Sequence, residues 1–245
     1  MGIRALLSLL VFIVWGSPLF AQFNLKKQIP DKLKYEPAAV YDSTYGIQVY
    51  ENLNIVYGTD SVRNCGSYAC QAWIEDFYTS GALLHKGFYL DGQLQTYKNF
   101  YPNGVVERDF RSVDAERGLM KIYFENGAIK SDIKYNYGIS ESWIEYNEKG
   151  VIVFQEQMEK HMKWLSFKKT FYDDGSPKSA LEITDKKKAV YSYKEFHPGN
   201  KIALEGIKFF VEDVGDYVYD GTWKYYDENG KVIKEEVYSK GLKIK

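Results

Sequence analysis

The sequence has few of the residues from which active sites and metal sites are usually built. Only three histidines occur in 245 residues, and His85, His161 and His197 show no His-x-x-x-His or glutamate-paired metal spacing. We expect each of them to be exposed to solvent or to lie in a turn. The glycine spacings of a phosphate loop and of a nucleophile elbow are also missing. We therefore expect no enzymatic activity, no catalytic residues, no cofactor and no metal site.

Carboxylates are plentiful, but their sequential pairs do not suit glycoside hydrolysis. Such an enzyme holds two carboxyl groups about 5–10 Å apart across a cleft. Neighbouring residues on a strand point to opposite faces, so a sequential pair cannot flank one bond. We interpret these pairs as solvent-facing or turn residues: Glu75–Asp76, Asp173–Asp174 and Glu235–Glu236.

Charge of one sign is also lacking, with 32 basic and 33 acidic residues. A nucleic-acid binder would show a basic surplus, so nucleic acid is not an expected partner. The balance does not favour an anionic membrane surface either.

The longest apolar run, from Ala5 to Trp15, is too short to span a bilayer, which needs about 20 residues. Arg4 precedes the run, and Ala21 offers a small residue at a cleavage position. This pattern is typical of a signal peptide over residues 1–21. Retention of the segment as an anchor is the alternative. We expect an exported protein that is periplasmic, outer-membrane-associated or secreted.

Only two cysteines occur, Cys65 and Cys70, with four residues between them. In an exported protein such a pair favours a local disulfide over a metal site. Two free buried thiols are the alternative, and the spacing excludes a redox Cys-x-x-Cys.

Aromatic residues are abundant, at 17% of the chain with 22 tyrosines, beside 20 glycines and only 6 prolines. Aromatic side chains favour half-buried pleated surfaces, and glycine supplies tight turns. Together they predict many short strands.

A turn residue recurs along the chain, at intervals of 23, 23, 23, 25, 25 and 30 residues. Such periodicity is the signature of a repeat architecture. Asn-Gly turns between alternating runs, as at Gly104 and Gly127, are strong hairpin signals. The predicted turn residues are Gly81, Gly104, Gly127, Gly150, Gly175, Asn200 and Gly230.

Two positions are shared by all seven units. Two residues after the turn residue stands an apolar residue or proline: Leu83, Val106, Ile129, Ile152, Pro177, Ile202 and Val232. Four residues before it stands an aromatic, which we expect to form the core of the sheet. These aromatics are Phe77, Phe100, Tyr123, Tyr146, Phe171, Phe196 and Tyr226.

The last unit, Gly221-Thr222-Trp223-Lys224-Tyr225-Tyr226-Asp227-Glu228-Asn229-Gly230-Lys231, resembles the MORN repeat. It is most similar to the bacterial MORN variant found in exported and antitoxin-like proteins. The resemblance spans about Ala72 to Lys245 and implies an all-β fold, in which tandem hairpins form one long curved antiparallel sheet. It implies no catalytic residues. The unit around Gly175 departs from the pattern, with Lys168 where other units place Trp, Tyr or Met, and with Pro177 in the aliphatic position.

We therefore divide the chain into a signal peptide (1–21), a lead-in and capping segment (22–70) and an array of about seven hairpins (71–245). Within the lead-in, Tyr45–Tyr57 is expected to supply an edge strand. Gln155–Lys163 favours either a helix or a polar return strand. The insertion Ile207–Tyr219 is expected to pack its Phe209–Phe210 pair on the sheet, and Leu242–Lys245 to complete a final strand.

The function indicated is a non-enzymatic scaffold that binds a protein or envelope component of unknown identity. Alternatives are an antitoxin or immunity-like partner of a toxin, and a lipid- or polysaccharide-binding module. Aromatics outside the regular positions are the candidate surface-binding residues. They are Trp73, Tyr89, Trp143, Trp164 and Tyr219.

The signal peptide can be tested directly. Expressed in a bacterial host, the exported chain should begin at Gln22, as measured by intact mass spectrometry. Ala21→Trp should block cleavage because signal peptidase requires a small residue at the cleavage position. An exported wild-type chain that still starts at Met1 would contradict the prediction.

Overall fold

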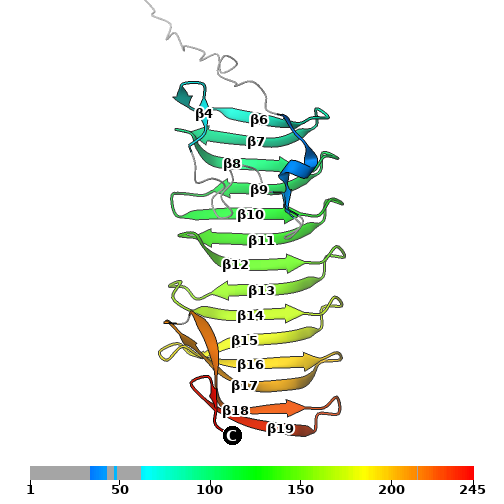
Figure 1. Ribbon diagram of the computed structural model, residues 1–245, viewed down its shortest axis with the longest axis vertical. Helices are drawn as coiled ribbons and strands as arrows, with labels where there is room; N and C mark the ends of the chain where they lie inside the picture. The colour runs from blue at the N-terminus through cyan, green and yellow to red at the C-terminus, as the bar shows by residue number, and fades with distance from the viewer. Residues whose placement is uncertain (1–33, 43–46, 49–61, 214) are drawn as a thin grey trace, which may run out of the picture.

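The computed structural model describes residues 34–42, 47–48, 62–213 and 215–245, and most of them form one sheet. The sheet has 16 strands, and β6 to β19 follow one another in chain order as antiparallel hairpins. Figure 1 shows these strands side by side along the long axis of the molecule. The prediction of an all-β array of tandem hairpins is confirmed.

Two short strands complete the sheet at its ends. β1 pairs in parallel with β6, and β20 pairs with β19. The pairs β2–β3 and β4–β5 form separate two-stranded sheets. A 3-10 helix, η2, spans Pro37–Val40. The strands are β1 Lys34–Tyr35, β2 Tyr41–Asp42, β3 Ile47–Gln48, β4 Asn64–Cys65, β5 Tyr68–Ala69, β6 Trp73–Tyr78, β7 Leu83–Leu90, β8 Gln93–Phe100, β9 Val106–Ser112, β10 Arg117–Tyr123, β11 Ile129–Asn136, β12 Ile139–Tyr146, β13 Ile152–Met158, β14 Leu165–Phe171, β15 Pro177–Asp185, β16 Val190–His197, β17 Lys201–Val211, β18 Asp216–Tyr226, β19 Val232–Ser239 and β20 Leu242–Lys243.

Every predicted turn residue joins the two strands of one hairpin and has a positive φ, as at Gly104 with 84°. Only glycine and a few polar residues adopt this conformation without strain. In the sixth unit the positive φ extends over both Gly199 and Asn200, at 89° and 68°. The exchanged order of glycine and asparagine is therefore accommodated by a second left-handed residue.

The two shared positions of each unit face each other across the hairpin. A register shift lies beside this pair in each of the seven units. One additional residue is thereby accommodated at the same place in every unit. The opposed pairs are Phe77 and Leu83, Phe100 and Val106, Tyr123 and Ile129, Tyr146 and Ile152, Phe171 and Pro177, Phe196 and Ile202, and Tyr226 and Val232.

Because the register is repeated, directly opposed residues form continuous rows across the strands, and we name the two faces after these rows. The charged face carries the row Glu75, Lys86, Lys98, Asp109, Lys121, Asp132, Ile144, Gln155, Lys169, Ala180, Lys194, Glu205, Lys224 and Glu235. The aromatic face carries the row Ile74, Gly87, Tyr97, Phe110, Met120, Ile133, Trp143, Glu156, Lys168, Leu181, Tyr193 and Gly206.

The main core lies on the aromatic face, and this corrects one expectation. The aromatics four residues before the turns are only half-buried. Phe77, for example, alternates with the buried Ile74, Asp76 and Tyr78 of the same strand. Strand alternation places it on the charged face, with its pairing partner Leu83. These aromatics therefore pack across each hairpin but do not form the buried core.

The residue three before the turn links most of the successive units. Tyr78, Tyr101 and Tyr172 donate their hydroxyl protons to the carbonyls of Phe100, Tyr123 and Phe196 in the next unit, at 2.7, 2.8 and 2.8 Å. His197 bonds the Tyr226 carbonyl in the same way. In the last unit this position is Asp227, whose carboxylate accepts bonds from its own turn, at the Asn229 and Lys231 amides.

The less regular segments differ in part from expectation. Most of the predicted edge strand Tyr45–Tyr57 lies outside the described residues, and the parallel strand at that edge is β1. Gln155–Lys163 begins as strand, because β13 extends to Met158. The insertion lengthens β17 and β18 to 11 residues each. Its Phe210 packs against the cluster of Leu165, Leu181 and Tyr191. The expected final strand is β20.

The links between units can be tested by removing one hydroxyl. Tyr101→Phe should lower the free energy of unfolding by about 1 kcal/mol, because the Tyr123 carbonyl loses a part-buried donor. Tyr68→Phe is the matched control, since that side chain is 76% exposed. Urea unfolding followed by circular dichroism measures both. Equal midpoints for the two variants would contradict this role of the hydroxyl.

Candidate binding site on the aromatic face

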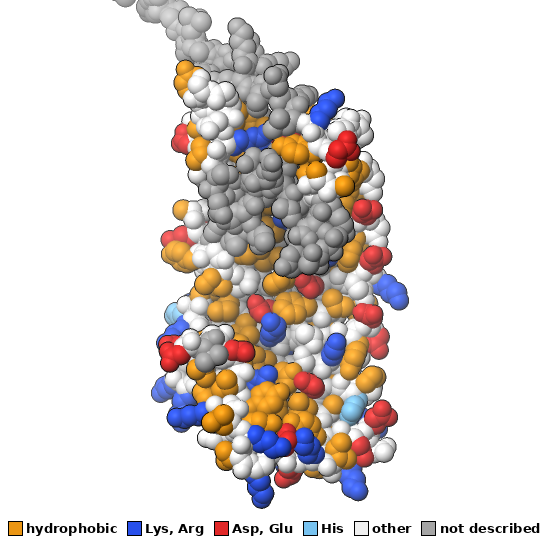
Figure 2. All heavy atoms as spheres, in the orientation of Figure 1, with side chains coloured by type: hydrophobic (Ala, Val, Ile, Leu, Met, Phe, Trp, Pro, Cys, Tyr) orange, Lys and Arg blue, Asp and Glu red, His pale blue; other side chains and the backbone are white. Residues whose placement is uncertain are grey.

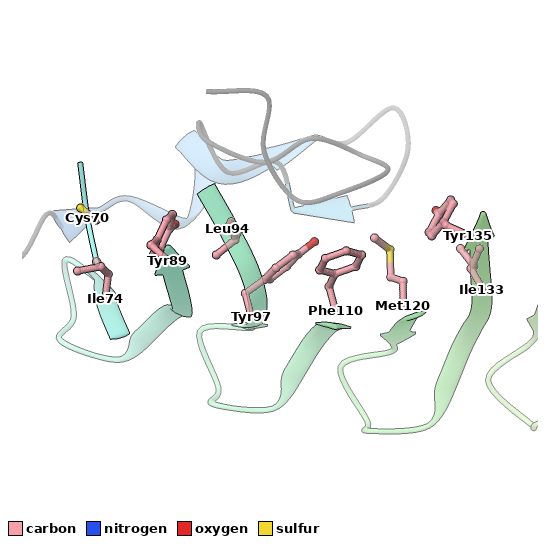
Figure 3. Close-up of a cluster of buried hydrophobic side chains, with 9 residues drawn as sticks. All are labelled: Cys70, Ile74, Tyr89, Leu94, Tyr97, Phe110, Met120, Ile133 and Tyr135. Atoms are coloured by element: carbon pink, nitrogen blue, oxygen red, sulfur yellow. The ribbon is translucent and has the colours of Figure 1, made fainter. Parts of the chain in front are cut away.

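The N-terminal part of the aromatic face is buried. Figure 3 shows its apolar side chains rising from successive strands toward the N-terminal segment. Cys65 and Cys70 form a disulfide, and Cys70 packs on this cluster. Tyr97 and Phe110 stack with their ring centroids 5.4 Å apart. The cluster comprises Cys70, Ile74, Tyr89, Leu94, Tyr97, Phe110, Met120, Ile133 and Tyr135.

A buried polar network holds the N-terminal segment on this face. Both terminal nitrogens of Arg63 bond the Asp76 carboxylate at 2.7 Å, and one also bonds the Tyr89 hydroxyl at 3.2 Å. His85 joins the Tyr89 hydroxyl at 3.1 Å and the Asn99 side chain at 2.8 Å. Burial, together with a smaller effect of the nearby Arg63 charge, lowers the pKa of His85 to about 4. His85 is therefore neutral at pH 7.

Three predictions fail at this network. Tyr89, a candidate surface residue, is fully buried, and so is His85, which was expected in solvent or a turn. Asp76 is 1% exposed rather than solvent-facing. The common reason is Arg63, which approaches from outside the repeats and supplies the partner that a buried carboxylate requires. The periodicity of the repeats gives no indication of the contact with Arg63.

The C-terminal part of the same face is more open, and apolar side chains gather there at the surface (Figure 2). The lengthened β17–β18 hairpin contributes Phe210 and Tyr217, whose ring centroids lie 5.2 Å apart. Phe210 meets the edge of Trp164 at 6.1 Å, and Tyr217 packs edge-on against Tyr191 at 4.9 Å. The insertion thus builds an aromatic wall beside β14 and β16.

A pocket of about 260 Å³ lies between this wall and the sheet. Its polar side is formed by Glu156 on β13 and Lys168 on β14, which are direct cross-strand neighbours with an N–O distance of 3.5 Å. Here the apolar central row of the aromatic face is interrupted by an ion pair. We define the binding pocket by its lining residues: Glu156, Met158, Lys163, Trp164, Leu165, Lys168, Phe210 and Tyr217.

A second aromatic group lies further toward the C-terminal end. Tyr219 stacks on Trp223 with centroids 3.8 Å apart and an interplanar angle of 14°. The Lys208 ammonium lies 4.0 Å from the Tyr193 ring centroid and 5.1 Å from that of Tyr219. Gly206 makes this packing possible, because a Cβ there would lie 2.3 Å from the Trp223 ring. The group is closely packed and stabilises this end of the sheet.

The structure separates the remaining candidate surface residues. Trp73 is 50% exposed and opposes Phe88 at the first strand of the array, on the charged face. Trp143 is half-buried against Phe154. Only Trp164 and Tyr219 lie at the open C-terminal end. Glu156, Phe210 and Tyr217 were not predicted as site residues, although the long last interval and the departure at Lys168 indicated the region in which they lie.

The charged face carries a hollow of about 440 Å³, lined by Asp109, Arg111, Leu119, Lys121, Asp132 and Lys134. Most of the charges on this face neutralise one another across the strands. Five cross-strand or diagonal ion pairs lie on it, at 2.6–3.8 Å: Lys86–Glu75, Lys98–Asp109, Lys121–Asp132, Lys169–Glu182 and Lys194–Glu205. Exposed pairs of this kind contribute less than about 1 kcal/mol each. Within the part of the chain that the structure describes, no cluster of His, Cys, Asp and Glu could hold a metal ion. No helix in that part is long and apolar enough to cross a membrane.

Comparison with known families agrees with the repeat. Residues 116–137 and 219–240 match the family described as MORN repeat variant. The two segments contain the turns at Gly127 and Gly230 in the same register. No curated protein matches the chain.

Burial of His85 predicts a pH dependence of stability. Its pKa is about 4 in the folded chain and about 6.5 when unfolded, so only the unfolded state gains a proton between these values. His85 therefore contributes stability above pH 6.5 that is lost as the pH falls toward 4, on the order of 2–3 kcal/mol. His85→Gln should flatten this part of the pH profile, measured by urea unfolding from pH 7.5 to 4.5. The control is His161→Gln, because His161 is exposed, and identical profiles for wild type and His85→Gln would refute the effect.

Proposed function

We propose that this chain is a non-enzymatic, exported repeat scaffold that binds a protein or a cell-envelope component on the C-terminal part of its aromatic face. The MORN repeat variant found at two places suggests a repeat scaffold or binding module in its own right. The proposal of export is based on the signal-like pattern of residues 1–21. The proposal of a non-enzymatic role is based on the missing catalytic motifs in the sequence.

One observation carries the choice of surface. The aromatic face is covered at its N-terminal end by the segment that contains Arg63 and the disulfide. At the other end Trp164, Phe210 and Tyr217 remain half-exposed around a pocket. Aromatic residues around a partly desolvated pocket are the usual energetic centre of an interface.

A capture experiment tests the proposal. Purified protein spanning residues 22–245 should retain a specific component from envelope extracts of the source cells. Trp164→Ala should reduce the retained amount at least about tenfold, because it removes one wall of the pocket. Trp73→Ala is the matched control, since it removes an exposed tryptophan from the opposite face. Retention that is absent in wild type, or unchanged by Trp164→Ala, would count against the proposal.

A further inference from the structure

The polar side of the binding pocket carries one carboxylate and two ammonium groups. Glu156 and Lys168 form an ion pair, and the Lys163 ammonium lies 4.7 Å from the Trp164 ring centroid. One Glu156 oxygen faces Lys168, and the other accepts a weak bond from the Ser140 hydroxyl at 3.4 Å. Each carboxylate oxygen has two lone pairs, and an ammonium has three donors, so both groups of the ion pair retain hydrogen-bonding capacity toward a ligand. A ligand with hydroxyl groups can therefore bond both partners without breaking the ion pair.

The opposite side of the pocket is apolar and aromatic. Trp164, Phe210 and Tyr217 surround it, and Met158 and Leu165 complete the lining. The ligand must therefore present an apolar surface on one side and adjacent donors and acceptors on the other. With about 260 Å³, the pocket is smaller than the range of about 300–1,000 Å³ typical of drug-sized ligands. It accommodates one ring rather than an extended molecule.

We propose that this pocket binds a single pyranose ring of a glycan. The C–H face of the sugar would pack on the aromatic wall, while neighbouring hydroxyls donate to Glu156 and accept from Lys168. An ion pair with an N–O distance of 3.5 Å suits two vicinal hydroxyls, because each hydroxyl can meet one partner. This inference deepens the proposed function by naming the class of ligand, and it rests on that function.

The position of the pocket in the array supports recognition rather than packing. Every other member of the central row on the aromatic face is an apolar or aromatic residue or glycine. Lys168 stands where other units have Trp, Tyr or Met. The insertion in β17–β18 places Phe210 and Tyr217 beside the same pocket. Two independent departures from the repeat therefore meet at one place. An apolar pair at these positions would stabilise the folded chain more, since a partly buried ion pair contributes little net free energy of folding.

Binding of soluble sugars tests this directly. The full purified chain would be titrated with neutral tetrasaccharides of glucose, mannose and N-acetylglucosamine, and with an acidic tetragalacturonate, using saturation-transfer NMR and calorimetry. We expect at least one of these four tetrasaccharides to bind. Glu156→Gln and Trp164→Ala should each weaken that binding at least about tenfold, through loss of a charge-assisted hydrogen bond and of the aromatic wall. Trp73→Ala should leave it unchanged, and circular dichroism would establish that each variant is folded.

The outcomes separate this inference from the proposed function. No binding of any of these sugars, or sugar binding that Glu156→Gln and Trp164→Ala leave unchanged, overturns the pyranose assignment. If envelope capture depends on Trp164 while no sugar binds, the scaffold function stands and the ligand is a protein. If neither is observed, both proposals fail.

Discussion

The structure depends on one constraint that is repeated in every hairpin: the aromatic four residues before the turn opposes the residue two after it. A glycine or asparagine with positive φ closes each turn, and a register shift follows at the same place. In a strand, a slip of one residue would move every side chain to the opposite face. Identical turns therefore keep the two faces distinct across all seven hairpins. Without this common register neither the central row nor the pocket would exist.

The ends of the array show how such a sheet is terminated. At one end Arg63 pairs with the buried Asp76, and at the other Lys243 pairs with Glu236, which is 5% exposed. In the last unit, the position that links most units to the next is occupied by Asp227, which bonds its own turn instead. Long sheets with open edges invite pairing with other chains, and short, charged edge strands such as β20 reduce that risk. The repeated hairpins thus form the middle of the sheet, while residues that depart from the repeat terminate the sheet at both ends.

The same division separates the covered part of the aromatic face from its open part. Its N-terminal end is occupied by the chain itself, through Arg63, Cys70 and the polar network around His85. Its C-terminal end carries the pocket, built where Lys168 and the β17–β18 insertion depart from the pattern. The regular units thus form a continuous support, and the proposed recognition site lies at the units that depart from the pattern. Stacked repeats favour this arrangement because each unit contacts mainly its neighbours and tolerates local change.

The sequence alone determined the hairpins, their turns and their number, because these depend on local chemistry: φ at glycine or asparagine, and the alternation of aromatic and polar residues. It also indicated the disulfide partners and the two irregular regions. Only the tertiary structure decided which face became the core. It also showed that Tyr89, His85 and Asp76 are buried. Arg63, from outside the repeat, bonds Tyr89 and Asp76, and His85 in turn bonds Tyr89. In the same way it brought Phe210 of β17 beside the neighbours Glu156 and Lys168 of β13 and β14. Contacts of this kind depend on how the chain returns over its own sheet, and no local pattern encodes that path.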